Sequence, residues 1–332
     1  MTLHAAHHYA LSLEPHYPDT MAGPIAQLWQ HRKEGMFRGV DQRNIGWTGL
    51  TGNNPDKVII VVNGRIESYW KYQELFYDLV RQGYDVYALD HRGQGVSDRL
   101  TEDTELGHVE NFDDYVTDLA TFYHEVVAPH GYRQHFILAH SMGGTIASLF
   151  LARNPGLIDS AVLSAPMHGI NLKHWMRPIA SPLARVIEQL QRQPNYAPGQ
   201  VPYYPKPFAN NPLSQSQTRY QWFRDLYEHK PDLKLGGPSA RWVWQGIAAA
   251  KRCIVEAQHI TTPVLLLQAS QDTIIDNQAQ QRFCQAMQQA GNDCQIMVIP
   301  GARHEILFER DTFRTPALIA AFDHFRKAEI MQ

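Results

Sequence analysis

The sequence has few cysteines, no long apolar run and no marked excess of charge of either sign. The cysteines, at positions 253, 284 and 294, are too few and too widely spaced for a disulfide framework, and they lack the spacing of a zinc site. We interpret them as free thiols in a reducing compartment. No apolar run approaches the ~18 residues of a membrane span, and residues 1–20 lack the basic start and apolar core of a signal peptide. We therefore expect a cytoplasmic protein; contact with the inner membrane surface stays open, because it needs no spanning segment.

The charge balance narrows the possible partners. The 332 residues include 30 Lys and Arg against 33 Asp and Glu, which gives a formal net charge of −3. A nucleic-acid-binding protein is usually basic, so this balance argues against one. The composition, 44% hydrophobic and 19% charged, is typical of a globular protein long enough for one large domain or two modest ones.

Strand-like and helix-like stretches alternate from residue 57 onward. The expected strands are 57–62, 84–89, 135–139, 160–164, 263–268 and 295–299, chosen for short apolar runs bounded by turn residues. The expected helices are 69–82, 111–127, 142–154 and about 278–290, chosen for apolar residues at helical spacing. Strands separated by helices predict an α/β fold with a mostly parallel central sheet and helices on both faces.

Residues 166–260 interrupt this alternation. The segment is rich in proline, glutamine and aromatic residues and contains no convincing strand, so we predict an inserted, largely helical lid. The core is then 35–165 with 261–332, and residues 1–34 form an N-terminal extension. A first lid helix is expected from Pro178, a favoured residue of a first turn. It would carry an apolar stripe of Ile179, Leu183, Val186, Ile187 and Leu190. This stripe could pack on the core or face a membrane or acyl chain.

The strongest chemical signal lies at residues 139–144, Ala-His-Ser-Met-Gly-Gly, between an expected strand and an expected helix. A sharp strand-to-helix turn of this kind lifts a serine hydroxyl above the sheet, and small neighbours give the turn room. The following helix points backbone N–H groups at developing negative charge. We therefore predict that Ser141 is a nucleophile.

A serine needs a base, and the base needs an orienting acid. In one known chain order of such triads the serine is followed by the acid and then by the histidine. Asp272 comes just after the expected strand 263–268, and His304 comes after the expected strand 295–299. We predict that these two residues complete the triad. Asp276 is the competing acid, but it lies further from the strand end.

An oxyanion hole needs two backbone N–H groups. We expect one from Met142, directly after the serine, and one from Arg65 in the loop after the first core strand. The Arg65 side chain could meet an anionic head group or pair with Glu67 or Asp90. The Gly-rich loop 90–97 lacks the spacing and lysine of a nucleotide-binding loop, so we interpret it as turn structure that supports the site.

These segments together resemble the lid-bearing α/β-hydrolases of the monoacylglycerol-lipase and lysophospholipase group. The motifs are VVNGRIESY, DHRGQGVSDR, FDDYVTDL, AHSMGG, SAPM and ARHEILFE, and the resemblance covers the chain from Gly35 onward. It implies the α/β-hydrolase fold and gives Ser141, Asp272 and His304 the triad roles, with Arg65 and Met142 as the oxyanion donors. One departure is Asn63, where the group usually has histidine.

The resemblance implies hydrolysis of the acyl ester of a lysophospholipid or related monoacyl lipid through an acyl-enzyme, without metal or cofactor. A monoacylglycerol lipase or general carboxylesterase, and a non-catalytic lipid-binding protein, stay open as alternatives. For the lid we expect substrate contacts from Trp175, Arg219, Trp222 and Trp242. We also expect Arg219 and Arg224, with other lid cations, to face an anionic or zwitterionic lipid surface. The alternative is that these cations are solvated and the lid aromatics pack onto the core. The oligomeric state is left open.

Overall fold

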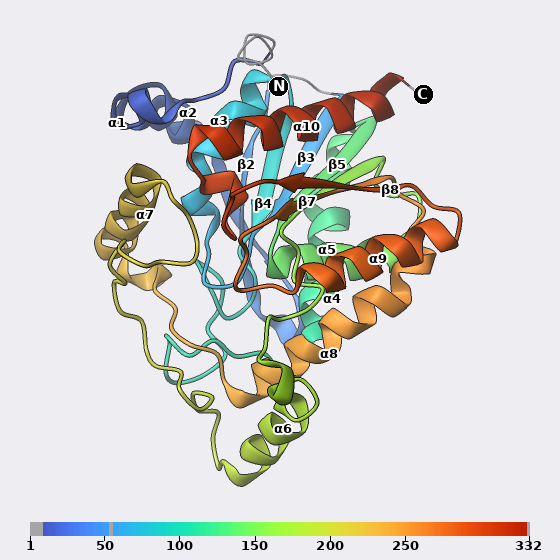
Figure 1. Ribbon diagram of the computed structural model, residues 1–332. Coiled ribbons are helices and arrows are strands. Elements are labelled where there is room, and N and C mark those ends of the chain that lie inside the picture. Colours follow the sequence, from blue (N-terminus) through green and yellow to red (C-terminus); the bar gives the residue numbers. More distant parts are fainter. Residues whose placement is uncertain (1–8, 53–55, 331–332) are drawn as a thin grey trace.

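The computed structural model describes residues 9–52 and 56–330, and its centre is an eight-stranded sheet in the order β1-β2-β4-β3-β5-β6-β7-β8 (Figure 1). The strands are β1 (Lys33–Arg38), β2 (Asn44–Leu50), β3 (Lys57–Val62), β4 (Asp85–Leu89), β5 (Gln134–His140), β6 (Ser160–Ser164), β7 (Val264–Ala269) and β8 (Cys294–Ile299). Strand β2 runs antiparallel to β1 and β4, whereas every pair from β4 to β8 is parallel. The predicted mostly parallel sheet is therefore confirmed.

Helices cover both faces of this sheet (Figure 1). The helices are α1 (Tyr17–Thr20), α2 (Ala26–Gln30), α3 (Gln73–Arg81), α4 (Phe112–Phe122), α5 (Met142–Arg153), α6 (Ala180–Leu190), α7 (Gln217–His229), α8 (Ala240–Glu256), α9 (Asn277–Gln289) and α10 (Asp311–Ile330). Within β3, Val58, Ile60 and Val62 pack with α4, α5, α8 and α9, whereas Ile59 and Val61 pack with α3 and α10. The strand is thus apolar from Val58 to Val62 because both of its faces are buried there.

The antiparallel strands β1 and β2 were not predicted from the sequence. Their sequences, KEGMFR and NIGWTGL, contain glycine and charged residues and lack a continuous apolar run. Strand β1 lies at the edge of the sheet, where polar residues face solvent. It begins at Lys33, inside the segment that we expected to precede the core.

Residues 9–32 cover the outer side of α3 and α10. Tyr9 packs on Phe322 of α10, with ring centroids 5.1 Å apart. The Ser12 hydroxyl donates to Glu74 Oε1 at 2.7 Å, and Ser12 N donates to Asp78 Oδ1 at 2.7 Å. These contacts attach the segment to the core.

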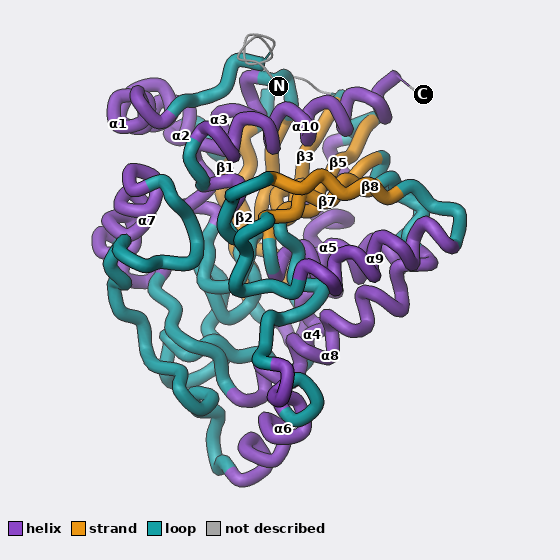
Figure 2. Tube along the Cα trace, viewed as in Figure 1, coloured by secondary structure: helices purple, strands orange, loops and turns teal. Residues whose placement is uncertain are grey.

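Three helices, α6, α7 and α8, lie within the predicted lid, and long loops join them (Figure 2). Helix α8 packs on α5 and α4, and its Trp242, Ala249 and Cys253 belong to the main buried cluster. It therefore forms part of the helical layer against the sheet. Helix α6 lies at the tip of the molecule, farthest from the sheet (Figure 1).

The apolar stripe of α6 does not pack on the core. Ile179, Leu183 and Val186 are each more than 40% exposed, and Leu190 is 81% exposed. The helix buries only two residues, Ala180 and Ala184, along its length. The packing alternative is therefore wrong for these four side chains, which face outward, whereas the fifth member of the stripe, Ile187, is half-buried.

The prediction that Arg219 and Arg224 face a lipid surface is also wrong, because both side chains are buried. Arg219 donates to both carboxylate oxygens of Glu74 at 2.8 Å and pairs with Asp311 at 2.8 Å. It therefore ties α7 to α3 and to the start of α10. No helix in residues 9–52 or 56–330 is both long and apolar enough to cross a membrane.

Candidate active site

Ser141 lies at a sharp turn between β5 and α5. Its backbone has φ 54° and ψ −120°, a conformation that L residues rarely adopt. The turn is possible because two glycines follow Met142 in the first turn of α5. A Cβ atom on Gly143 would lie 2.2 Å from the carbonyl oxygen of Val62, and one on Gly144 would lie 2.5 Å from Cβ of Pro166. The glycines therefore let the helix approach β3 closely and leave the serine half-buried at the turn.

The structure brings the three predicted triad residues into one hydrogen-bonded chain. His304 Nε2 lies 2.9 Å from Ser141 Oγ, and His304 Nδ1 lies 2.7 Å from Asp272 Oδ2. Asp272 follows β7 and His304 follows β8, so each side chain comes from a loop at the carboxyl end of a neighbouring strand. The arrangement can move a proton from the serine to the imidazole while the carboxylate fixes the ring.

The environment of Asp272 keeps it ionised. Its side chain is 0% exposed, and this burial alone would raise its pKa. The hydrogen bond and charge of His304, together with the amides of Ile275 and Ile274, outweigh burial and hold the pKa of Asp272 below its usual value. The competing acid, Asp276, instead caps α9 by accepting a hydrogen bond of 3.0 Å from the amide of Gln278.

The loop after β3 approaches Ser141 from the other side. A Cβ atom on Gly64 would lie 3.2 Å from Cβ of Ser141, so the loop passes directly over the serine. Gly64 N donates to Glu67 Oε2 at 2.6 Å, which occupies that amide. In the described part of the chain no acceptor binds the amides of Arg65 or Met142. These are the two amides expected in the oxyanion hole.

The Gly-rich loop 90–97 holds the loop after β3 in place. Asp90 accepts hydrogen bonds from Asn63 Nδ2 at 3.0 Å and from Tyr69 N at 2.7 Å. Gln94 Nε2 donates to the carbonyl oxygens of Gly64 and Glu67, both at 2.8 Å. The interpretation of 90–97 as supporting structure agrees with these contacts, and Asn63 anchors the loop through its amide group.

A buried charged cluster under this loop was missed by the sequence analysis. Lys71 Nζ lies 2.8 Å from Glu67 Oε1 and 2.8 Å from Glu305 Oε1, and the Tyr72 hydroxyl donates to Glu67. Burial opposes the charge of Glu67, but Lys71, His140 and the hydrogen bonds from Lys71 and Tyr72 lower its pKa to about 2. The only sequence signal was the position of Glu305 next to His304 and of Glu67 near Arg65.

The four lid residues that were expected to contact the substrate lie in different parts of the structure. Trp175 is 65% exposed on the outside of the lid, and Trp222 packs against Tyr17 with ring centroids 6.3 Å apart. Arg219 is occupied by Glu74 and Asp311, as described above. Trp242 alone lies beside the loop after β3, with its ring centroid 5.2 Å from Cζ of Arg65. In the described residues, no group of three or more His, Cys, Asp or Glu side chains is arranged to hold a metal ion.

Comparison with known proteins places the chain in a family. The model of the family described as serine aminopeptidase, S33 matches residues 53–311. Lysophospholipase L2 of Escherichia coli is 42% identical over 313 residues, which cover 92% of this chain and 91% of the relative. Monoacylglycerol lipase of Mycolicibacterium smegmatis is 27% identical and covers 84% of this chain and 92% of the relative.

Solved structures agree on the fold. A soluble variant of monoglyceride lipase from Saccharomyces cerevisiae aligns with a TM-score of 0.68 and 18% identity, over 90% of this chain and 96% of that chain. A carboxyl esterase from Bacillus coagulans aligns with a TM-score of 0.69 and 17% identity, over 88% and 98%. Two motifs of the sequence, GRIESYWKY at 64–72 and LGHV at 106–109, resemble bacterial lysophospholipase L2 in particular, and the relatives found agree with this resemblance. The chain has the α/β-hydrolase fold and belongs to the serine aminopeptidase S33 family.

Proposed function

We propose that this protein hydrolyses the acyl ester of lysophospholipids, releasing a fatty acid and a glycerophospho-alcohol. The observation that carries the proposal is the hydrogen-bonded chain of Ser141, His304 and Asp272, in a chain 42% identical to Escherichia coli lysophospholipase L2. The family hosts several ester substrates, so the substrate is proposed from these relatives and not from the fold.

The geometry supports a two-step reaction. Ser141 Oγ attacks the ester carbonyl as His304 Nε2 takes its proton, and Asp272 stabilises the imidazolium that forms. The amides of Arg65 and Met142 bind the developing oxyanion. The tetrahedral intermediate collapses, and His304 gives the proton to the leaving glycerol oxygen. Water then attacks the acyl-enzyme with His304 as base, and the fatty acid leaves. Another alcohol could replace water, which would transfer the acyl group to a second lipid.

The main rival is a monoacylglycerol lipase, which the Mycolicibacterium smegmatis relative favours. The two substrates differ by the phosphate-linked head group. A comparison of kcat/KM for a lysophospholipid and a monoacylglycerol with the same acyl chain separates them, and a preference for the monoacylglycerol would overturn the proposal. A non-catalytic lipid-binding protein would instead leave Ser141 unlabelled by a fluorophosphonate probe.

We also propose that the outer face of α6 contacts an anionic membrane surface peripherally. Leu183 and Leu190 are exposed on the helix, and Trp175 is exposed in the turn that precedes it. An apolar surface of this kind is suited to the boundary of the lipid head groups. The exposed cations Lys173 and Arg192 flank it, and no carboxylate pairs with either one in the described residues. Their charge would add attraction to anionic lipid.

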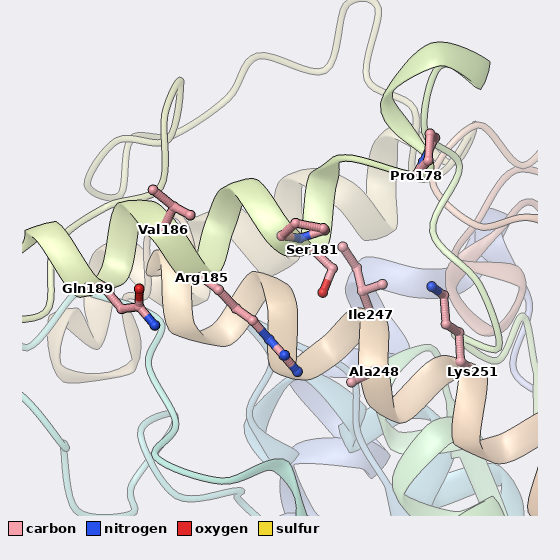
Figure 3. Close-up of a pocket in the computed structure, with 9 residues that line it drawn as sticks. Pro178, Ser181, Arg185, Val186, Gln189, Ile247, Ala248 and Lys251 are labelled. Atoms are coloured by element: carbon pink, nitrogen blue, oxygen red, sulfur yellow. The ribbon is translucent and has the colours of Figure 1, made fainter.

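A groove between α6 and α8 continues this face. It has a volume of about 520 Å³ and is lined by Val186, Ile247 and Ala248, with Arg185 and Lys251 along its sides (Figure 3). Apolar walls with cations beside them suit an acyl chain below an anionic head group. The groove therefore supports the same orientation of α6 toward lipid.

A further inference from the structure

Three cations near the loop after β3 have no carboxylate partner. In the described residues, buried arginines generally pair with acids, as Arg92 does with Asp118 and Arg314 with Asp78. Buried Arg224 differs, because no carboxylate oxygen in residues 9–52 or 56–330 lies within 4.0 Å of it, and the same holds for half-buried Arg65 and exposed Lys206. A buried cation without a counter-ion is unfavourable unless a ligand supplies the charge.

Arg224 is the most enclosed of the three. Its side chain is 8% exposed and lies over the rings of Phe223 and Tyr220, with Cζ 4.7 Å and 4.8 Å from their centroids. Nη2 donates to the Tyr220 hydroxyl at 3.1 Å, but Nε is buried without any hydrogen-bond partner. The acid one helical turn away, Glu228, pairs with Lys234 at 2.8 Å. Arg224 thus keeps an unused donor, and aromatic rings and tyrosine hydroxyls surround its charge in place of a carboxylate.

Hydrogen bonds connect Arg224 to Lys206. The Tyr220 hydroxyl that accepts from Arg224 donates to the carbonyl oxygen of Lys206 at 3.0 Å. Lys206 is exposed at the edge of this cluster. Partial burial and repulsion from Arg224 and then Arg65 lower the pKa of Lys206. The helix of Arg224 also lies against the loop of Arg65, because the hydroxyl of Tyr227 donates to the carbonyl oxygen of Ile66 at 2.9 Å.

Arg65 connects the cluster to the ester site. It follows Gly64, which passes over Ser141, and its Nη1 donates to the carbonyl oxygen of Gly236 at 3.1 Å. Neither Glu67 nor Asp90 pairs with it, because Glu67 binds Lys71 and Asp90 binds Ser68. Burial lowers the pKa of Arg65 to about 10, so it stays charged at neutral pH. Among the residues that the structure describes, its guanidinium pairs with no carboxylate.

We propose that Arg65, Lys206 and Arg224 form a phosphate-binding subsite that receives the phosphodiester of the head group while Ser141 attacks the ester. This inference rests on the proposed hydrolysis of lysophospholipids. The phosphate of such a lipid is separated from the ester by only the glycerol backbone, so a subsite next to the oxyanion loop is within reach. Guanidinium groups suit this ligand because their planar donors match phosphate oxygens. A monoacylglycerol offers no charge to this subsite.

The first experiment measures selectivity. For each protein, kcat/KM is determined with a short-chain lysophosphatidylethanolamine and with the monoacylglycerol of the same chain, both below micelle formation. The selectivity ratio is kcat/KM for the lysophospholipid divided by kcat/KM for the monoacylglycerol. We expect Arg224→Gln to lower this ratio about tenfold to a hundredfold, the range for losing a hydrogen bond to a charged group. Lys206→Gln, an exposed change that leaves folding intact, lowers the ratio by about twofold to fivefold.

The matched control is Arg133→Gln, which removes the same charge from a side chain that is 81% exposed at the start of β5. Its ratio stays at the wild-type value. If Arg224→Gln and Lys206→Gln both leave the ratio unchanged, or lower both rates equally, the three cations only stabilise the lid and the inference is wrong. Thermal unfolding checks that Arg224→Gln is folded, and Lys206→Gln decides the question if it is not.

The second experiment separates this inference from the proposed function. Glycerol 3-phosphate and inorganic phosphate are tested as competitive inhibitors of the hydrolysis of a short neutral ester. We expect both to inhibit the wild type, with inhibition constants at least about tenfold higher in Arg224→Gln. No inhibition by glycerol 3-phosphate would overturn the subsite.

The combined results have distinct meanings. Hydrolysis of lysophospholipid with a ratio that is independent of Arg224 would preserve the proposed function and overturn the subsite. If inhibition by glycerol 3-phosphate depends on Arg224 but the enzyme prefers monoacylglycerol, the subsite is preserved and the proposed function is overturned. Inhibition by inorganic phosphate without any change in the substrate ratio would assign the cations to free phosphate and overturn their role in head-group recognition.

Discussion

The amide nitrogen of Gly64 lies 2.6 Å from Oε2 of Glu67, so a buried carboxylate holds the loop that passes over Ser141. Glu67 is held in turn by Lys71, which also pairs with Glu305 beside His304. The amide of Arg65, one residue after Gly64, takes its position from this contact. One ionic cluster thus connects the proposed oxyanion loop with the loop that carries His304, the proposed base.

Glu67→Gln should therefore reduce turnover without touching the substrate. We expect kcat for ester hydrolysis to fall about tenfold to a hundredfold with a smaller change in KM, because a displaced oxyanion donor acts mainly in the transition state. Steady-state kinetics on a soluble ester measure this. Glu102→Gln, on an exposed loop, is the control. Wild-type kcat in Glu67→Gln would show that the contact does not position the loop.

The pH dependence of stability gives a separate test of Glu67. Its pKa in the folded protein is lowered to about 2, below the ~4.3 of an unfolded chain. A carboxyl with a depressed pKa stabilises the fold above its unfolded value, and this contribution is lost as pH falls from about 4 toward 2. Urea unfolding at pH 6 and pH 3 should show a smaller loss of stability in Glu67→Gln than in the wild type. Equal losses would contradict the lowered pKa.

Ser141→Ala should abolish ester hydrolysis and labelling by a fluorophosphonate probe. Removal of a triad nucleophile costs about 10⁴-fold to 10⁶-fold in kcat. Alanine retains Cβ and replaces only the hydroxyl, so circular dichroism should match the wild type. Turnover within about tenfold of wild type in the purified variant would rule Ser141 out as the nucleophile.

Asp272→Asn and Asp276→Asn form a matched pair four residues apart. Asp272→Asn should lower kcat by about 10³-fold to 10⁴-fold, because asparagine cannot hold the histidine in its working tautomer. Asp276→Asn should leave kcat within about twofold, since asparagine is an equally good helix cap. Kinetics on both variants decide, and the opposite ranking would transfer the acid role to Asp276.

The outward stripe of α6 predicts binding to anionic vesicles. Leu183→Ser with Leu190→Ser should weaken co-sedimentation with phosphatidylglycerol vesicles by about tenfold or more, from the loss of buried apolar area. Val255→Ser, which alters a side chain 67% exposed on α8, should bind like the wild type. Hydrolysis of a soluble ester is expected to be unchanged in both variants. If the wild type itself fails to bind at low salt, the stripe does not contact lipid.

The sequence was sufficient to nominate Ser141, Asp272 and His304, because each follows an apolar strand and glycines mark the turn. It could not reveal the burial of Arg219, whose partners Glu74 and Asp311 are 145 and 92 residues away along the chain. A lid arginine looks the same in a sequence whether it faces water or a distant carboxylate. For the same reason, the lysine that joins Glu67 to Glu305 had no recognisable pattern.

The shallow attachment of α6 has a consequence for how such enzymes diversify. Only Ala180 and Ala184 of this helix are buried, and Glu188 joins it to α8 through Arg241 and Trp244. Exchange of residues 173–192 for another sequence would remove few core contacts and leave the sheet, the turn at Ser141 and the loop at Gly64 intact. The tip of the molecule is thus free to vary in sequence, and a chimera that carries the corresponding segment of a relative should fold with nearly the same thermal stability and a different preference for lipid surfaces.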